Sequence, residues 1–349
     1  MPRRRTVTLA VSGTLLAGFV AGALFQPVPY AELTPGPTFD VLGSQNGTPL
    51  ITITGKQTYP TNGQLRMVTV GVSDESYQMP LGQALLGWLN NSEAIVPKDS
   101  IYPPGQTQQQ SDAENTQEMT DSQDSAVTAA LAELGIKPTG SGVVIASVND
   151  GSPAANKLQA GDLIDSIDGT PISSGGTAGM TAVTGAIQKV KPGEQVTFVV
   201  TRDQKKKTVV TGTTNSGGKA EVGISIESEN VFPFTVDIQL NNVGGPSAGM
   251  MFALGIIDKL TPGGLTEGKV IAGTGTIDAQ GNVGAIGGIQ MKTIGARDAG
   301  ATVFLAPAAN CAEAKANQPA GLELVKVNTL NDALTALQDI KAGKTPPLC

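Results

Sequence analysis

A serine and a lysine are the residues of this sequence best suited to chemistry, because the chain contains no histidine. Sites of the Ser-His-Asp or Cys-His kind, and zinc sites with histidine ligands, are therefore excluded. Ser247 follows a glycine-rich turn over residues 241–246 (NNVGGP) and opens an apolar stretch over residues 248–257 that predicts a helix. Pro246 suits the entry into that helix, and small neighbours leave the hydroxyl approachable. Taken alone, Ser247 is equally explained as a helix cap, which is a common role.

The candidate base is Lys292, which lies 45 positions after Ser247 on an expected helix over residues 289–299. A lysine on such a helix is normally a solvated charge. The near neighbours Ile289, Met291 and Ile294 are apolar, however, and burial among them would lower the lysine pKa. A neutral amine of this kind can accept a serine proton. The N–H groups of Ser247 and Ala248, at the start of a helix, would then bind the developing oxyanion.

Around these two residues we expect an α+β fold of mixed sheets and helices, with an inserted domain that resembles a β-barrel. Residues 103–115 are polar and poor in apolar side chains, so we expect an exposed loop there. A helix is expected next, over residues 119–134. Alternating, β-branched or apolar runs predict strands over residues 50–54, 65–70, 270–277 and 299–307.

Residues 138–212 form a self-contained pattern. A glycine-rich turn leads into a strand, Gly151-Ser152-Pro153-Ala154 follows, and residues 158–169 read LQAGDLIDSIDG. This pattern closely resembles a PDZ domain, although the glycines are also explained as turn residues of a small β domain. The resemblance implies a peptide that is added as a strand, with its terminal carboxylate on backbone N–H groups. The implied binding residues are Thr139, Gly140, Ser141, Gly142, Val143, Val144 and Ile145.

The segments around Ser247 and Lys292 resemble the Lon protease family. Residues 245–249 (GPSAG) are similar to its nucleophile motif, and residues 287–292 (GGIQMK) are similar to the segment with its catalytic lysine. The resemblance implies that Thr274 helps to position the lysine. Residues 118–131 are similar to the first helix of the family, which implies that the PDZ-like unit is inserted within the catalytic domain.

Two departures from the family pattern lie close to the candidate dyad. Val243-Gly244 stands where Lys-Asp is usual before Gly-Pro-Ser, and Thr276 stands where an acidic residue is usual after Thr274-Gly275. Both touch the surroundings of the dyad rather than the dyad itself. They therefore bear on substrate handling and regulation more than on reaction type.

The beginning of the chain predicts a membrane anchor. Three arginines at positions 3–5 precede an uncharged, mostly apolar run over residues 6–25, which is long enough to cross a bilayer. The arginines should remain cytoplasmic, which places the rest of the chain outside. A cleaved signal peptide is the alternative, but residues 26–29 offer no small-x-small cleavage site. An outside location would also permit a disulfide between Cys311 and Cys349.

Composition argues against other partners. The net charge of −7 and the aromatic share of 4% do not fit a nucleic-acid binder. Residues 263–269 match the first part of a P-loop, but Val270 stands where a Mg²⁺-binding Ser or Thr is required, so no nucleotide is expected. Two cysteines are too few for a zinc cluster, and we expect no metal or cofactor.

The predicted domain order is a cytoplasmic stub, a transmembrane anchor, the first part of a Lon-like domain, a PDZ domain, and the rest of the Lon-like domain with the dyad. The corresponding residues are 1–5, 6–25, 30–135, 138–212 and 222–349.

The sequence thus predicts a single-pass membrane protein that resembles Lon-like serine proteases with a PDZ domain from Gram-positive bacteria. It would cleave accessible or unfolded polypeptides outside the cytoplasm without ATP, and the PDZ domain would recruit or gate them. Family resemblance also implies a hexameric ring. Two alternatives stay open: an inactive, membrane-tethered PDZ scaffold, and a protein that cleaves only itself, within residues 103–115.

Overall fold

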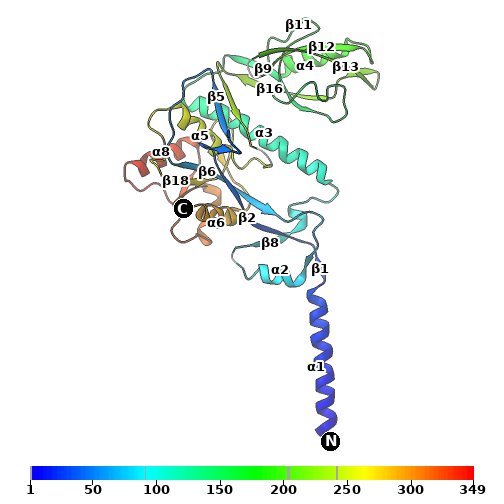
Figure 1. Cartoon of the computed structure of the whole chain (residues 1–349), viewed down its shortest axis with the longest axis vertical. Helices are drawn as coiled ribbons and strands as arrows, with labels where there is room; N and C mark the ends of the chain where they lie inside the picture. Colours follow the sequence, from blue (N-terminus) through cyan, green and yellow to red (C-terminus); the bar gives the residue numbers. More distant parts are fainter. Residues whose placement is uncertain (1, 91, 203–204, 241–242) are drawn as a thin grey trace. The chain divides into compact units, whose positions relative to one another are not determined.

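The computed structural model describes residues 2–90, 92–202, 205–240 and 243–349, which divide into two compact units (Figure 1). The first unit comprises Met1–Leu50, Tyr59–Ala126 and Gln239–Cys349, and the second comprises Ile51–Thr58 and Val127–Ile238. The second unit is therefore inserted into the sequence of the first. The fold is α+β, as the sequence predicts.

The first unit contains a mixed sheet. Its strands are β2 (Tyr30–Asp40), β6 (Gln64–Val72), β8 (Ala94–Pro97), β18 (Val270–Gly273), β21 (Val303–Pro307) and β22 (Glu323–Val327). They lie in the order β22-β21-β18-β6-β2-β8, and β22 to β6 are parallel while β2 and β8 are antiparallel to their neighbours. Three separate two-stranded sheets are formed by β1 (Pro27–Val28) with β7 (Met79–Pro80), by β3 (Ser44–Gln45) with β4 (Thr48–Pro49), and by β19 (Thr276–Ile277) with β20 (Val283–Gly284).

Helices cover both faces of this sheet. The first unit as a whole contains the helices α1 (Pro2–Leu24), α2 (Leu81–Gly87), α3 (Gln108–Glu133, which continues into the second unit after Ala126), α5 (Gly249–Leu260), α6 (Ile289–Asp298), α7 (Cys311–Ala316) and α8 (Leu330–Lys341), with 3-10 turns η1 (Lys98–Ser100) and η2 (Ala308–Asn310). Ala272 of β18 packs in one cluster with Ile289 of α6, whereas a Cβ at the next residue, Gly273, would lie 2.7 Å from Sδ of Met251 in α5. Since successive strand residues face opposite sides, α5 and α6 cover opposite faces of β18.

Helix α3 begins earlier than the sequence pattern indicates. The prediction of a loop over residues 103–115 is wrong from Gln108 onward, because residues 108–115 form the first turns of α3. Thr107 Oγ1 accepts from Gln110 N at 3.2 Å, and Gln110 Oε1 accepts from Thr107 N at 2.9 Å. This reciprocal pair is a capping box, and it starts a helix despite the polar composition.

Helix α1 contains a segment, Val7–Leu24, that is long and apolar enough to cross a membrane. Its side chains are not covered by other parts of the described chain. A signal sequence near the beginning of a chain has the same length and composition, so these properties fit either an anchor or a leader.

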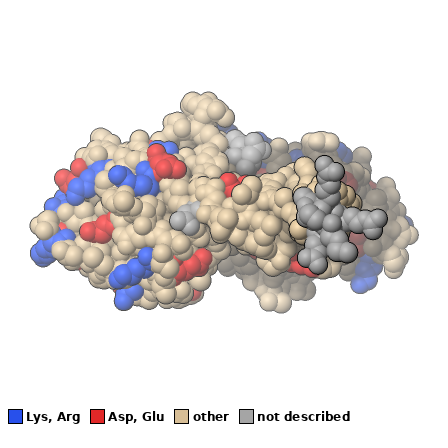
Figure 2. All heavy atoms as spheres, turned by 90° about the horizontal axis from the view of Figure 1, so that it is seen from below, with Lys and Arg blue, Asp and Glu red and all other residues tan. Residues whose placement is uncertain are grey.

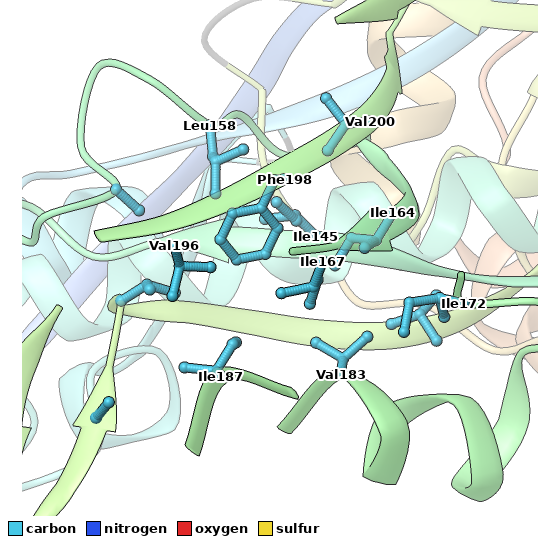
Figure 3. Close-up of a cluster of buried hydrophobic side chains, with 14 residues drawn as sticks. Ile145, Leu158, Ile164, Ile167, Ile172, Val183, Ile187, Val196, Phe198 and Val200 are labelled. Carbon is cyan, nitrogen blue, oxygen red and sulfur yellow. The ribbon is translucent and has the colours of Figure 1, made fainter. Parts of the chain in front are cut away.

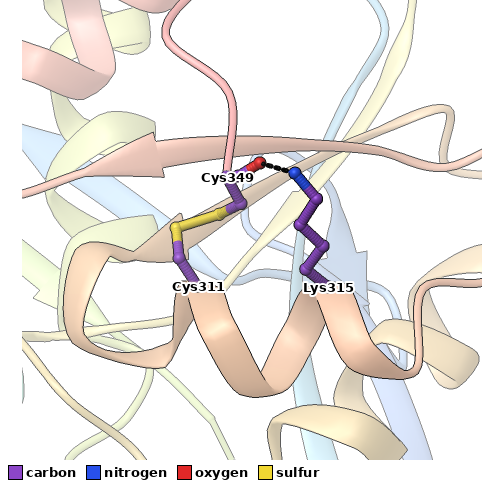
Figure 4. Close-up of a disulfide and its surroundings, with 3 residues drawn as sticks. All are labelled: Cys311, Lys315 and Cys349. Atoms are coloured by element: carbon purple, nitrogen blue, oxygen red, sulfur yellow. Dashed lines mark hydrogen bonds between the residues drawn. A yellow bond between two sulfur atoms is a disulfide. The ribbon is translucent and has the colours of Figure 1, made fainter.

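A disulfide joins Cys311 at the start of α7 to Cys349 (Figure 4). Lys315, one turn further along α7, donates from Nζ to the carbonyl oxygen of Cys349 at 2.8 Å. The last residues also follow β22, with Cys349 N donating to Leu324 O at 3.0 Å. These contacts tie residues 347–349 to the edge of the sheet.

The second unit has its own sheet and core. Its elements are β5 (Ile51–Thr54), β9 (Gly140–Val148), β10 (Leu163–Ile167), β11 (Thr170–Pro171), α4 (Gly176–Gln188), β12 (Gln195–Arg202), β13 (Lys205–Gly212), β14 (Thr214–Ser216), β15 (Lys219–Glu221), β16 (Ile224–Val231) and β17 (Thr235–Ile238). The main strand order is β13-β12-β10-β9-β16. Phe198 of β12 is completely buried in the core beside Ile167 of β10, and Val183 and Ile187 of α4 close this core from the other side (Figure 3).

Residues 222–238, which the sequence pattern assigns to the catalytic domain, lie in this second unit. The reason is a long-range pairing, since β16 runs antiparallel to β9 from Ile224 opposite Val148 to Val231 opposite Gly140. Val222 is part of the same buried core.

Candidate active site

Three candidate residues meet at the carboxyl end of β18. Ser247 lies two residues before α5, Thr274 directly follows β18, and Lys292 lies in the first turn of α6. Thr274 links the amino-terminal ends of α5 and α6 at this point, because it hydrogen-bonds both Ser247 and Lys292. The fold thereby brings together residues that are far apart in the sequence.

The side chains are within hydrogen-bonding distance. Lys292 Nζ lies 2.9 Å from Ser247 Oγ and 3.3 Å from Thr274 Oγ1. Thr274 Oγ1 also donates to the carbonyl oxygen of Ser247 at 2.9 Å, as does Gly275 N at 2.9 Å. The backbone of Ser247 is therefore held by the same segment that contacts the lysine.

Burial changes the properties of the lysine. Lys292 is only 4% exposed and Thr274 only 1%, whereas Ser247 is half-buried and can be reached from solvent. Loss of hydration lowers the pKa of Lys292 from 10.5 to about 8. No carboxylate of the described residues opposes this effect, so a substantial share of the amine is neutral near physiological pH.

A left-handed glycine sets the beginning of α6. Gly288, the N-cap, has φ of 67°, and a Cβ there would lie 2.8 Å from Cγ2 of Val70 in β6. A side chain at this position would therefore force an unfavourable left-handed backbone conformation and would also clash with Val70. Lys292 N donates to Gly288 O at 3.1 Å, so this turn fixes the point at which the lysine leaves the helix.

Helix α3 holds the loop before Ser247 in place. Ser122 Oγ donates to Pro246 O at 2.9 Å, and Gly245 N donates to Asn115 O at 2.9 Å. We did not single out either α3 residue from the sequence. A signal for Ser122 was present, since it is a polar residue on the helix face that buries Met119 and Ala126.

The same helix explains one departure from the Lon pattern. A Cβ at Gly244, where an aspartate is usual, would lie 2.7 Å from Cβ of Asn115. Asn115 therefore fills the space that a side chain at position 244 would need. Asn241 and Asn242, which begin the predicted glycine-rich turn, lie outside the described residues.

Comparison with known proteins matches two segments of the chain to family models. Residues 117–213 match the family model of the PDZ domain, and residues 241–338 match that of the Lon protease (S16) C-terminal proteolytic domain. A stretch of 93 residues is 41% identical to Lon protease 1 of Sorangium cellulosum (strain So ce56), which covers 26% of this chain and 11% of that protein. The chain carries a Lon-type proteolytic domain and a PDZ domain.

Two solved structures are similar over about a quarter of the chain. The PDZ domain of an SdrC-like protein from Listeria monocytogenes is 31% identical, with a TM-score of 0.23 over 26% of this chain and 93% of its own. The corresponding domain from Listeria innocua is 30% identical, with a TM-score of 0.21 over 24% of this chain and 92% of its own.

The Lon-type domain contains all three candidate catalytic residues. In the part of the chain that the structure describes, no acceptor takes the N–H of Ser247 or of Ala248. Both predicted oxyanion donors therefore have no acceptor among the described residues. The stretch 263–269 forms turns and leads into strand β18 rather than into a helix, unlike the loop-to-helix geometry of a P-loop.

The PDZ domain corrects the predicted peptide-binding residues. Thr139 N donates to Val231 O at 2.7 Å, and residues 140–145 pair with β16 on one side, while Val144 and Ile145 contact β10 and its flank on the other. The prediction that residues 139–145 receive a peptide as an added strand is therefore wrong, because β9 is an internal strand. Among the described strands of this sheet, β16 ends the order and leaves its outer edge open beside α4.

Surface charge supports no nucleic-acid interface on the face drawn in Figure 2. Lys and Arg side chains are interspersed there with Asp and Glu, and neither sign forms a broad patch. The net charge of the chain is −7. This distribution differs from the basic stripe that phosphate backbones require.

Proposed function

We propose that this chain is a membrane-anchored serine endopeptidase that works without ATP, with Ser247 as nucleophile and Lys292 as general base. The observation that carries the proposal is the 2.9 Å contact between Lys292 Nζ and Ser247 Oγ. The lysine in this contact is buried, and its pKa is lowered to about 8. A neutral amine next to a serine hydroxyl is what proton abstraction requires.

In the proposed mechanism, neutral Lys292 takes the Ser247 proton while Oγ attacks the peptide carbonyl carbon. The N–H groups of Ser247 and Ala248 stabilise the resulting oxyanion. The ammonium then gives its proton to the leaving amine, and an acyl-enzyme remains. Neutral Lys292 next takes a proton from a water molecule, whose oxygen attacks the ester carbonyl carbon. The ester C–O bond then breaks, the ammonium returns the proton to Ser247 Oγ, and the carboxylic acid product leaves. Throughout, Thr274 orients the amine through the 3.3 Å contact.

The proposed role of the PDZ domain is to recruit or gate substrates. An extended peptide would add to the open edge of β16, beside α4. The amino-terminal end of α4 is tied to this strand, because Gly176 N donates to Ser228 Oγ at 2.5 Å. This hydrogen bond therefore fixes the distance between β16 and the start of α4, the two elements that would border the bound peptide.

We further propose that α1 remains attached and that both domains lie outside the cytoplasm, where unfolded or accessible chains are the substrates. The arginines at positions 3–5 favour this orientation. Amino-terminal sequencing of the membrane-bound protein tests the anchor, since an intact residue 6–25 segment is expected. A start after residue 25 would replace the anchor with a cleaved leader.

The deciding experiment is cleavage of casein by the full chain in detergent without ATP, from about pH 6 to about pH 10. Wild type is compared with Ser247→Ala, Lys292→Ala and, as a matched control, Lys344→Ala at an exposed lysine. Activity should vanish in the first two variants and persist in the third. If Ser247→Ala cleaves as well as wild type, the proposal fails.

Self-processing predicts a different result from the same experiment. A protein that cleaves only itself would leave casein intact and release fragments of its own chain. The expected site of such cleavage, residues 103–115, is helical from Gln108 onward. Because proteases cleave extended segments, this helix does not favour cleavage there. An inactive scaffold would cleave neither casein nor itself.

A further inference from the structure

Helix α2 and the residues after it have an apolar outer surface. Ala84 and Gly87 form the inner side and are buried. The outer side carries large apolar side chains, although the outward side of a surface helix is normally polar. We call these residues the apolar face: Leu85 (41% exposed), Leu86 (70%), Trp88 (52%) and Leu89 (83%). No charged residue occurs between Glu75 and Glu93.

The apolar face is continuous with the carboxyl end of α1. Leu81 N donates to Gln26 O at 2.8 Å, and Val28 of β1 pairs with Met79 of β7. A Cβ at Gly82 would lie 3.2 Å from Leu24 O. In Figure 1, α2 lies beside the upper end of α1, and its axis runs across that of α1. This is the orientation of a helix parallel to the membrane that α1 would cross.

A hollow of about 530 Å³ lies between the two helices. Leu24 and Phe25 line it from the α1 side, and Gly82 and Leu86 line it from α2. Phe25 is itself 79% exposed. Polar side chains, Glu32, Gln83, Asn90 and Glu93, line the rest of the hollow. Leu24, Phe25 and Leu86 border the same hollow, so exposed apolar side chains of the anchor and of the apolar face lie next to each other along one side of it.

We propose that the apolar face inserts into the outer part of the same membrane that α1 spans, so that lipid is its partner. The proposal rests on the proposed function only in taking α1 as an anchor. Continuity with α1 selects lipid over a second protein, because any bilayer around α1 also reaches the neighbouring α2. Interfacial helices bury their apolar side in the boundary between headgroups and acyl chains.

The surroundings of Trp88 fit this depth. Its ring packs edge to face on Tyr30, with ring centroids 5.4 Å apart, and its Nε1 donates to Ile95 O at 3.3 Å. The indole N–H is thus satisfied by protein while much of the ring is exposed. Tryptophan is enriched at this level of membranes because its ring is apolar and its N–H is polar.

Trp88 also provides the measurement, because it is the only tryptophan in the chain. The full chain is reconstituted into phosphatidylcholine–phosphatidylglycerol vesicles, and Trp88 fluorescence is quenched either by lipids with brominated acyl chains or by aqueous iodide. We expect strong quenching by brominated lipids and protection from iodide. Quenching by iodide but not by brominated lipids would overturn the proposal.

Two variants test whether the apolar face causes the effect. In Leu86→Glu/Leu89→Glu, Trp88 should lose quenching by lipid, and its emission should shift to the red. Val210→Glu changes a similarly exposed residue of β13, which is 45% exposed and outside the apolar face, and should behave as wild type. Equal lipid quenching in the double variant would contradict the proposal.

Flotation of the vesicles after alkaline extraction separates this inference from the anchor. A chain that floats while Trp88 remains unquenched by lipid retains its anchor but has no membrane contact at α2. A chain that does not float lacks both. Protection of Trp88 from iodide and from brominated lipid together would mean that protein, such as a second copy of the chain, covers the apolar face, and the proposal would fail.

Discussion

The two units treat a buried charged group in opposite ways. In the second unit, Asp162 is fully buried and faces Arg202, with Nε 2.5 Å from Oδ1 and Nη2 2.6 Å from Oδ2. Gln159 N also donates to this carboxylate at 3.0 Å. In the first unit, Lys292 is almost equally buried, but its amine hydrogen-bonds only the hydroxyl groups of Ser247 and Thr274 among the described residues.

This difference separates a structural charge from a reactive one. Two hydrogen bonds from the Arg202 guanidinium give the Asp162 carboxylate a counter-charge and fix the turn before β10. Lys292 has no counter-ion among the described residues, so burial favours its neutral form. The unpaired amine makes the fold less stable than a paired one would, but it produces a base.

The largest effect should come from changing the chemistry of the unpaired group. Lys292→Met keeps the length and burial of the side chain but cannot accept a proton, so casein cleavage should fall by at least about 10³-fold. Lys292→Arg should be equally inactive, because a guanidinium remains charged. Initial rates at pH 9 measure both. Retained activity in Lys292→Arg would contradict the contrast between structural and reactive charges, since a permanently charged group would then support cleavage.

Removal of the paired charge should instead affect stability alone. Arg202→Met leaves the Asp162 carboxylate buried without its partner, which typically costs about 3–5 kcal/mol. Urea unfolding monitors this loss. Casein should still be cleaved at low urea, because the change lies outside the Lon-type domain.

The matched control is an exposed ion pair in the same unit. Lys206 Nζ lies 3.9 Å from Asp165 Oδ2, and its side chain is 74% exposed. Lys206→Met should therefore change the stability by less than about 1 kcal/mol. Equal losses in the two variants would show that burial does not distinguish them.

The next effect has the opposite sign. Lys292→Met should stabilise the protein at pH 7 by ~3 kcal/mol, because it removes the cost of burying a charged ammonium away from water, the effect that lowers the lysine pKa from 10.5 to about 8. Between pH 8 and pH 10.5 the unfolded wild type binds this proton and the folded state does not. The wild type should therefore gain stability as pH rises through this window, until the advantage of the variant is lost.

Urea unfolding of both proteins at pH 7 and pH 10 measures how far the difference between their free energies of unfolding shrinks. The difference between them is informative, since other lysines titrate equally in both. A constant difference across this range would mean that Lys292 has an ordinary pKa in the folded protein.

Local sequence patterns were sufficient for the candidate dyad and for the two domain types. Ser247 and Lys292 each stand in a short motif whose turn, helix start and apolar neighbours are adjacent in sequence. The structure places these residues in contact, but whether they act as a catalytic dyad stays a prediction. The apolar neighbours Ile289, Met291 and Ile294 suggested that Lys292 could be buried; Ile289 and Met291 are buried, whereas Ile294 is half-buried.

The errors came from pairings between distant segments. The assignment of β16 to the wrong domain, and the choice of residues 139–145 as the peptide edge, share one cause. Both depend on β16 pairing with β9, and no local pattern encodes which strand occupies an edge. The early start of α3 was locally encoded, by contrast, in the capping box of Thr107 and Gln110.

The smallest effect compares two buried hydroxyls that both donate to a proline carbonyl. Ser122 Oγ bonds Pro246 O in the first unit at 2.9 Å, and Thr211 Oγ1 bonds Pro153 O in the second at 2.5 Å. Ser122→Ala and Thr211→Val should each cost about 1 kcal/mol of stability. Only Ser122→Ala should also lower kcat, because Pro246 precedes the nucleophile.

Ser122 is thus a positioning residue, and its variant should leave the pH midpoint of cleavage unchanged, because the surroundings of Lys292 are intact. Complete pH profiles of kcat for both variants test this. A severalfold loss in Ser122→Ala with the wild-type midpoint, beside normal kcat in Thr211→Val, is the expected result. Equal kcat in both would mean that the α3 contact stabilises the fold without orienting Ser247, and the comparison between the units would then hold for charged groups only.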